Sequence, residues 1–195
     1  MRKLTILLVA FCALFLFGAA AHAQQFDLTL GFSGVTGPKS TASAQTISGG
    51  TYPDFGLDFL FFKNLGVGFD AAFRAHQNLY QGFQPFRPFF YTADAVFAPP
   101  LGKRAQLEVK AGIGAESVHF YTATLTCTTF GGCNNFVSSN HFMGHVGGGV
   151  RLFVTKSIFI RPEAHLYIVH NNVEFSGSRV TRFGASIGYA FRNKE

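Results

Sequence analysis

Residues 179–191 read R-V-T-R-F-G-A-S-I-G-Y-A-F, and two kinds of side chain alternate along them. Successive side chains of a β-strand point to opposite faces, so this alternation predicts a strand with two different faces. One face carries the apolar residues Phe183, Ala185, Ile187, Tyr189 and Phe191. The opposite face is small or polar. Such a strand fits a soluble sandwich, with its apolar face inward, or the closing strand of a membrane barrel, with that face toward lipid.

The same alternation recurs seven times upstream, which predicts eight strands. The expected strands cover residues 26–35, 54–62, 65–74, 88–98, 105–118, 140–154, 158–169 and 179–191. Pro162 interrupts the seventh of them, and we expect a bulge there because proline has no N–H to give to a sheet ladder. No helical 3.6-residue pattern follows the N-terminal segment, so the chain is expected to be all-β.

The connections between these strands alternate in length. Those at 37–51, 76–86 and 119–139 are long, whereas those at 63–64, 99–103 and 155–156 are short. Up-and-down barrels of the outer membrane have this pattern, with short periplasmic turns, longer outer loops and strands of about ten residues. We therefore expect an eight-stranded antiparallel up-and-down transmembrane β-barrel with both barrel termini on the periplasmic side.

The N-terminus predicts export. Two basic residues precede an apolar run over residues 4–21, and A-H-A at 21–23 is a cleavage site of the A-x-A kind. This is the pattern of a secretory signal peptide, so we expect residues 1–23 to be removed and residues 24–195 to form the barrel domain. A retained transmembrane helix is the competing interpretation, because the run approaches spanning length.

Charge and cysteine content limit the partners. The formal net charge is +6, but the basic residues are scattered without a run or patch, so nucleic-acid binding is not expected. Cys127 and Cys133 flank T-T-F-G-G, and in an exported protein this pair predicts a local disulfide. There is no second pair to complete a zinc site. We expect no metal and no cofactor.

Charged residues at the inward positions predict a filled interior. The expected lumen charge network consists of Asp58, Asp70, Asp94, Glu108, Lys110, Arg151, Arg161 and Glu163. An eight-stranded barrel is only wide enough to be filled by side chains, and buried unpaired charges are costly. We therefore expect these groups to form salt bridges and to leave no open channel. Asp94 is expected nearly opposite Lys110 on the next strand.

The chain resembles the small outer-membrane β-barrel proteins, among them the OmpA-like transmembrane domain. The resemblance rests on the strand number, the alternation of connections and the last two segments, I-R-P-E-A-H-L-Y-I-V and R-V-T-R-F-G-A-S-I-G-Y-A-F. In the final segment, the residues that resemble the C-terminal assembly signal of such barrels are Arg182, Gly184, Ile187, Tyr189 and Phe191. The short tail after Phe191 leaves no room for a peptidoglycan-binding domain, so that activity is not implied.

The resemblance also implies surroundings and partners. We expect the outer membrane of a didermic (Gram-negative) bacterium, contact with outer-membrane lipids, and a monomer. Periplasmic chaperones and the barrel-assembly machinery are the implied partners during biogenesis. The surface ligand is not implied.

Few residues point to chemistry. His141, His145 and His165 share the inward parity, but His141 and His145 are about 13 Å apart along one strand and cannot chelate one metal together. Some small barrels modify lipid A, and Ser139-x-His141 with Glu116 nearby is the nearest approach to a serine-type site. We expect a non-enzymatic protein with a structural or surface-interaction role. The alternatives are a narrow porin-like channel, a lipid A-modifying hydrolase and a soluble lipocalin-like barrel.

Overall fold

The computed structural model describes residues 25–40, 45–62, 64–127 and 132–192. The expected signal peptide at 1–23 lies outside the described residues. The described part folds into strands β1 (Gln25–Thr36), β2 (Thr51–Phe62), β3 (Leu65–Phe73), β4 (Asn78–Tyr80), β5 (Gln84–Phe97), β6 (Ala105–Cys127), β7 (Cys133–Phe153), β8 (Ile158–Val169) and β9 (Arg179–Arg192). Within these residues no helix is long and apolar enough to cross a membrane.

Eight of these strands close on themselves as an antiparallel barrel. Each pairs with its neighbours in the order β3-β2-β1-β9-β8-β7-β6-β5, and β3 also pairs with β5, which completes the ring. The first and last strands pair along their whole length, from Gln25 opposite Arg192 to Thr36 opposite Thr181. The short strand β4 pairs with β5 outside this ring. The expected eight-stranded up-and-down barrel is confirmed.

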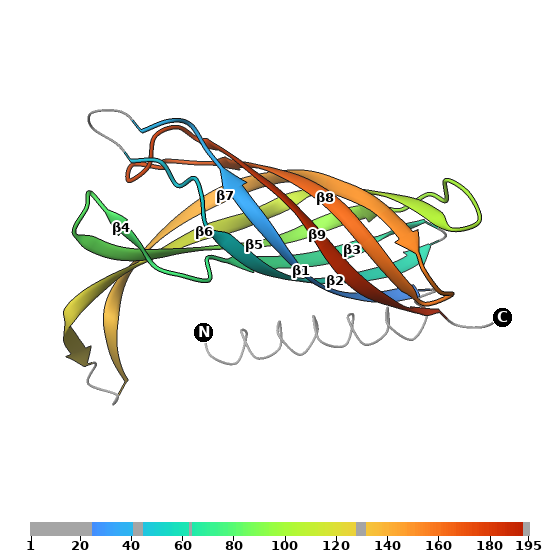
Figure 1. Cartoon of the computed structure of the whole chain (residues 1–195), viewed down its shortest axis with the longest axis horizontal. Coiled ribbons are helices and arrows are strands. Elements are labelled where there is room, and N and C mark those ends of the chain that lie inside the picture. Colours follow the sequence, from blue (N-terminus) through green and yellow to red (C-terminus); the bar gives the residue numbers. More distant parts are fainter. Residues whose placement is uncertain (1–24, 41–44, 63, 128–131, 193–195) are drawn as a thin grey trace, which may run out of the picture.

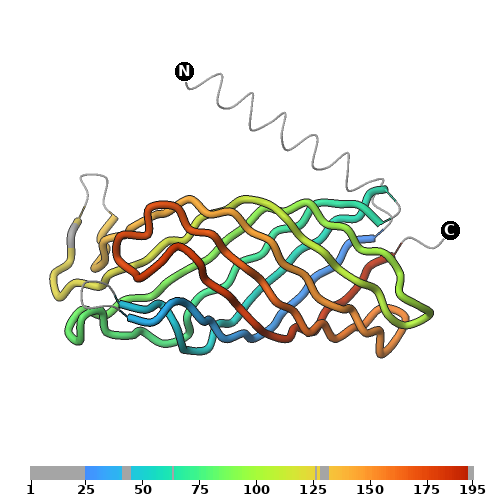
Figure 2. Tube along the Cα trace, turned by 90° about the horizontal axis from the view of Figure 1, so that it is seen from above, coloured from blue at the N-terminus to red at the C-terminus, as the bar shows by residue number. Residues whose placement is uncertain are grey.

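The two ends of the barrel differ (Figures 1 and 2). The end that we call the turn end has the connections at 63–64, 98–104 and 154–157, and β1 begins and β9 ends there. The opposite end, which we call the hairpin end, has the connections at 37–50, 74–83 and 170–178 and the projecting part of β6 and β7.

The expected connection at 119–139 is mostly strand. β6 and β7 pair from Ala105 opposite Leu152 as far as Cys127 opposite Cys133, with a register shift between Tyr121 and Thr126. The pair therefore forms a long hairpin that leaves the barrel and bends away from its axis (Figure 1). Threonine, valine and aromatic residues favour extended backbone, and this composition outweighed the serine and glycine that indicated a loop. The Cys127–Cys133 disulfide joins the two strands at its tip, as predicted.

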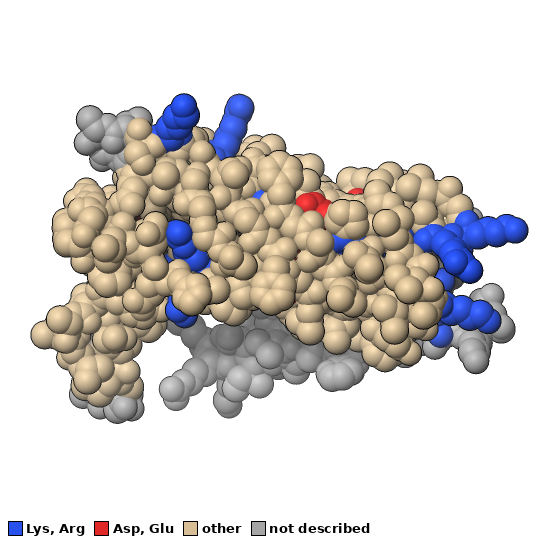
Figure 3. Space-filling view, viewed as in Figure 1, with Lys and Arg blue, Asp and Glu red and all other residues tan. Residues whose placement is uncertain are grey.

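Side chains alternate between the outside and the interior on each barrel strand. On β8 the outward residues Ile158, Ile160, Leu166 and Ile168 are 38–52% exposed, whereas every second residue between them is buried. Figure 3 shows an outer wall almost without charge between two ends at which Lys and Arg side chains project. The bulge expected at Pro162 is wrong, because the β8–β9 register passes through Pro162 opposite Ala185 without a shift. In the pairing of β7 with β8, however, Pro162 has no paired residue on β7.

The inward residues of β8 show how the interior is layered. Phe159 lies nearest the turn end, followed by Arg161, Glu163 and His165, and Tyr167 and Val169 lie nearest the hairpin end. All six are buried. The interior therefore has an apolar layer at each end and a polar layer between them.

Candidate functional site

Ten buried charged side chains meet in the middle of the barrel, and we call them the interior charge cluster. Its members are Lys110, Arg151, Arg161, Arg182, Asp27, Asp54, Asp58, Asp70, Glu108 and Glu163. Each is at most 6% exposed, and together they come from seven of the eight barrel strands. They meet because inward positions at the same height on neighbouring strands converge in a narrow barrel.

Lys110 lies at the centre of three carboxylates. Its Nζ atom is 2.7 Å from an oxygen of Asp58, 2.7 Å from an oxygen of Asp70 and 3.4 Å from an oxygen of Glu108. The contact with Asp70 is a hydrogen bond, and those with Asp58 and Glu108 are ion pairs. The lysine is fully buried, yet its charge is compensated.

Two arginines extend the cluster across the interior. Arg151 forms ion pairs with Asp27, Glu108 and, at 3.0 Å, Asp58. Arg161 contacts Glu108 at 2.6 Å and Glu163 at 2.7 Å, and it donates further hydrogen bonds to the hydroxyls of Ser186 and Thr29. Planar guanidinium groups with several donors suit such shared carboxylates.

Arg182 has a looser environment than the other three cations. Its guanidinium nitrogens lie 3.6 Å from Asp54, 3.8 Å from Glu163 and 3.9 Å from Asp70, and its charge faces the ring of Tyr167 at 6.0 Å. None of its three side-chain nitrogens has a hydrogen-bond partner among the described residues. The distances between Arg182 and its carboxylates are therefore longer than those between Lys110 and its carboxylates.

The sequence had placed eight residues in the charge network, and the structure puts seven of them in the cluster. The exception is Asp94, which lies opposite Gly112 in the β5–β6 register, while Lys110 lies opposite Val96. The expected position of Asp94 nearly opposite Lys110 is offset by two residues, and Asp94 accepts a hydrogen bond from Thr92 and contacts His145.

Three members of the cluster were not included in the expected network, namely Asp27, Asp54 and Arg182. All three occupy inward positions in the alternation of their strands, and this position could have indicated that they belong to the network. Arg182 was instead assigned to the expected assembly signal with Gly184 and three outward residues. On β9 those three, Ile187, Tyr189 and Phe191, are 44–63% exposed on the outer wall.

Apolar side chains close both ends of the interior. At the turn end, Phe159 is fully buried beneath the guanidinium of Arg151, and Leu60, Val96 and Ala98 form a small cluster. At the hairpin end a larger cluster contains Val35, Ile47, Tyr52, Phe86, Phe90, Val118, Met143, Tyr167, Val169, Phe175 and Val180. Apolar clusters therefore lie on both sides of the interior polar layer, and at the hairpin end the buried side chains of Arg74 and Glu116 lie there as well.

The hairpin-end cluster includes side chains from two connections. Ile47 comes from the connection between β1 and β2, and Phe175 comes from the connection between β8 and β9. The ring of Phe175 lies 5.3 Å from that of Phe86 and 5.8 Å from that of Tyr80. Both connections thus fold over the opening, a feature that strand periodicity could not predict.

Ser139 and His141 lie within hydrogen-bond distance at this end, with Ser139 Oγ 3.0 Å from His141 Nε2. The third member of the group is Glu174, which accepts a hydrogen bond from Ser139 and lies 2.8 Å from the same Nε2 atom. The expected third member was Glu116. That residue lies opposite His141 in the register and is fully buried, but its carboxylate oxygens have no hydrogen-bond partner among the described residues.

The geometry of this group differs from a serine-type relay. In such a relay the base nitrogen accepts the serine proton and an acid holds the other ring nitrogen. Here the Nε2 atom of His141 lies 2.8 Å from Oε2 of Glu174, an oxygen without a hydrogen-bond partner among the described residues, and 3.0 Å from Ser139 Oγ. Ser139 directs its own proton to Glu174. The contacts therefore describe a hydrogen-bonded anchor for Glu174 and its connection.

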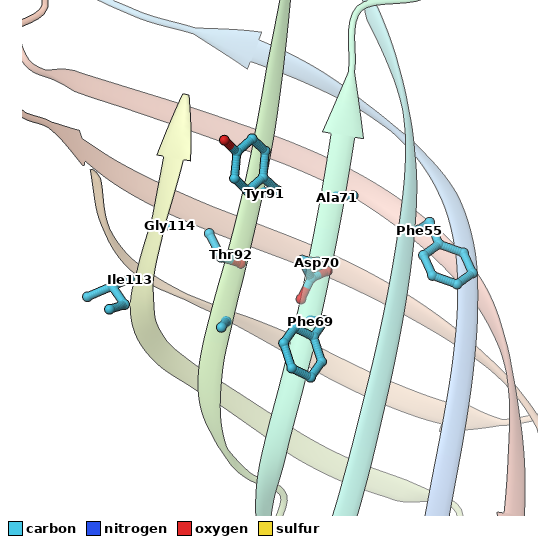
Figure 4. Close-up of a pocket in the computed structure, with 9 residues that line it drawn as sticks. Phe55, Phe69, Asp70, Ala71, Tyr91, Thr92, Ile113 and Gly114 are labelled. Atoms are coloured by element: carbon cyan, nitrogen blue, oxygen red, sulfur yellow. The ribbon is translucent and has the colours of Figure 1, made fainter. Parts of the chain in front are cut away.

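No set of three His, Cys, Asp or Glu side chains in the described ranges is placed to hold a metal ion. A recess of about 380 Å³ lies on the outer wall across β2, β3, β5 and β6 (Figure 4). It arises where Ala71 and Ala93 lie beside the larger Phe69 and Tyr91. Its lining does not include Ser139, His141 or Glu174.

Comparisons with known proteins identify the fold. No protein-family model matches the sequence, and no curated protein matches it. The chain is similar in structure to neisserial surface protein A (NspA), with a TM-score of 0.62, 13% identity and coverage of 86% of this chain and 96% of that chain.

Two further solved structures show the same likeness. The N-terminal β-barrel domain of Pseudomonas aeruginosa OprF has a TM-score of 0.58 and 8% identity, over 87% of this chain and 98% of that chain. Ail, the attachment invasion locus protein of Yersinia pestis, has a TM-score of 0.54 and 15% identity, over 86% of this chain and 98% of that chain. The chain has the fold of the small eight-stranded outer-membrane β-barrels.

Proposed function

We propose that this chain is an integral outer-membrane β-barrel protein without enzymatic activity, whose filled interior does not conduct and whose projecting hairpin presents a surface for interaction. The fold and the apolar outer wall support the membrane location (Figure 3). The protein is a monomer in contact with outer-membrane lipids, with the turn end in the periplasm and the hairpin end outside.

The interior charge cluster is the observation that carries the non-conducting part of this proposal. Lys110, Arg151 and Arg161 each contact at least three carboxylates within 4 Å, and apolar layers lie on both sides of the cluster. An ion crossing the barrel would have to disrupt these pairs and then pass between packed apolar side chains. Both steps are costly in a medium of low polarity.

Electrical recording tests this part directly. Purified protein is inserted into planar lipid bilayers, and its folded state in the same preparation is checked by heat-modifiable gel mobility. We expect no steady single-channel current. A reproducible, stepwise current from the unmodified protein would favour the narrow porin-like channel instead.

The surface role is supported by the β6–β7 hairpin. Residues 117–140 contain no Asp, Glu, Lys, Arg or Pro, and Leu125 and Val137 are 71% and 64% exposed. Natural sheet edges are usually protected by charged residues or proline, and the part of this hairpin beyond the barrel has neither. The disulfide at the tip keeps the two strands together. A partner strand or an apolar surface could therefore dock there.

The lipid A hydrolase remains a second candidate because of one observation, the 3.0 Å contact between Ser139 and His141. The test is the mass of lipid A from cells that express the protein, compared with cells that express Ser139→Ala. We expect identical lipid A in both, because Glu174 contacts Ser139 Oγ and His141 Nε2. Loss of an acyl chain that depends on Ser139 would establish the enzyme.

A further inference from the structure

Two buried histidines contact each other directly. They lie between the interior charge cluster and the apolar cluster at the hairpin end. His145 on β7 and His165 on β8 are each 2% exposed, and their rings are stacked with centroids 5.1 Å apart. The Nε2 atom of His145 lies 2.9 Å from the Nδ1 atom of His165. This distance is that of a hydrogen bond, so one of the two facing nitrogens carries a proton and the other does not.

A glycine makes this contact possible. Gly147 lies opposite His165 in the β7–β8 register. A Cβ atom at Gly147 would lie 2.5 Å from His165 Nδ1 and 2.9 Å from His145 Nε2. Any larger residue would therefore intrude on both nitrogens, and the glycine leaves the space that the ring contact occupies.

Carboxylates lie at both ends of the histidine pair. Asp94 Oδ1 is 2.6 Å from His145 Nδ1, and Asp94 is itself held by the hydroxyl of Thr92. At the other end Glu163 Oε1 is 3.5 Å from His165 Nε2. The order Asp94, His145, His165, Glu163 is thus a chain of four groups across the interior.

The proton positions follow from this order. The carboxylate of Asp94 requires an N–H on Nδ1 of His145, so a neutral His145 has an unprotonated Nε2. That atom must accept from Nδ1 of His165. If His165 is neutral as well, its Nε2 is unprotonated and faces the carboxylate of Glu163. One added proton on this Nε2 atom would face Glu163 Oε1 at 3.5 Å, and neither of these two buried atoms has a hydrogen-bond partner among the described residues.

A second added proton does not fit. It would have to be placed on Nε2 of His145, where an N–H would point at the N–H of His165 over 2.9 Å. Two like-charged rings would also lie side by side, with centroids 5.1 Å apart. The geometry therefore has room for one extra proton and excludes two.

We infer that His145 and His165 form a single proton-binding site that takes up one proton as a unit. This goes beyond the proposed function and holds whether or not the barrel conducts. The charged groups around the site are Asp94 on β5, Glu163 on β8, Arg182 on β9 and Asp70 on β3, which contacts Arg182. Tyr167 stacks on the ring of His145.

The interior has unequal numbers of buried acidic and basic side chains. The buried residues of the described part include eight Asp and Glu but five Lys and Arg. Arg182 lies opposite His165 in the register and opposes a further positive charge, although its nitrogens are already close to Glu163 and Asp70. A single added proton reduces the excess of buried carboxylates and lies between two of them.

The test is a nitrogen-15 NMR titration of the histidine rings in the folded, full-length barrel in detergent micelles. Over the pH range in which the barrel stays folded, we expect His145 and His165 to change together in one step. The pair should carry three ring N–H groups below that step and two above it. The signals of the exposed His76, which lies outside the pair, serve as an internal control.

Two variants separate the pair from single histidines. In Gly147→Ala the ring contact is lost, and we expect the common step to split into two. In His165→Gln, which retains amide donor and acceptor groups, we expect His145 to lose that step. The proposal is overturned if the unmodified barrel shows two independent steps, four ring N–H groups, or two N–H groups at every pH.

Discussion

Arg161 on β8 donates to Glu108 on β6 over a distance of 2.6 Å, although β7 lies between their strands. The same guanidinium contacts Glu163 on its own strand and Ser186 on β9. One side chain therefore links several strands of the barrel through its interior. These links are additional to the backbone ladders, which join only adjacent strands.

We predict that Arg161→Glu destabilises the barrel by at least about 3 kcal/mol, because it leaves buried carboxylates unpaired and adds another. Heat-modifiable gel mobility measures this as a lower temperature at which the folded band disappears. Arg104→Glu is the matched control, since it reverses an exposed charge at the turn end. If both variants unfold at the temperature of the unmodified protein, the cluster does not stabilise the fold.

Removal of the disulfide is expected to leave the barrel intact. Cys127 and Cys133 close a loop with a sequence separation of 6, and so short a loop contributes less than about 3 kcal/mol in the chain-entropy model. The double variant Cys127→Ser/Cys133→Ser should therefore still show the folded band. Thiol labelling of both cysteines in unfolded, non-reduced protein would contradict the bond itself.

Gly188 is predicted to be required for closure of the turn end. A Cβ atom at this position would lie 2.2 Å from the ring of Phe159, which is fully buried beside Arg151. We expect Gly188→Ala to cost about 1–3 kcal/mol, the usual range for overpacking. Gly34→Ala is the control on the neighbouring strand, because nothing lies within 4 Å of a Cβ atom there. The same thermal midpoint for both variants would contradict this packing.

Phe175 is predicted to hold the connection between β8 and β9 against the hairpin end. Phe175→Ser removes the ring that packs on Phe86 and Tyr80, so residues 170–178 should become sensitive to limited proteolysis while the barrel stays folded. Val173→Ser in the same connection is the control, because Val173 is 77% exposed. Equal cleavage of the two variants would show that Phe175 does not anchor the segment.

The orientation in the membrane can be checked with epitope tags. A tag inserted next to Gly132, beside the Cys127–Cys133 disulfide, should be reached by antibody on intact cells. A tag between Gly102 and Lys103 in a turn-end connection should be reached only after permeabilisation. The reverse result would show that the hairpin end faces the periplasm.

Much of the fold could be predicted because alternation is a local property of the sequence. On β8 the period of two assigned Arg161, Glu163 and His165 to the interior, and the structure has all three buried. Parity alone, however, does not say which groups meet. Asp94 and Lys110 face the same interior, but the register places them two rungs apart and their contacts go to different partners.

The hairpin end was less predictable for a physical reason. Residues such as Phe175 and Glu174 lie in a connection without periodicity, so nothing in the local sequence indicates that one packs inward and the other binds Ser139. Their positions depend on contacts between segments that are far apart in the chain. The long hairpin was missed because its threonines and serines suit both loops and exposed strands.

The pairing of β1 with β9 has a consequence for synthesis. The two strands come from opposite ends of the chain, yet they share an unbroken ladder from Gln25 to Thr36. During translation and export, the edge of β1 that pairs with β9 therefore stays unpaired until β9 has been made. The backbone hydrogen bonds on that edge, about half of those that β1 forms, are absent until then. A chain that stops before residue 179 would keep two open edges and could not close. Such long-range pairing is slow to form, so protection of the early segments until the final strand arrives is a requirement of this fold.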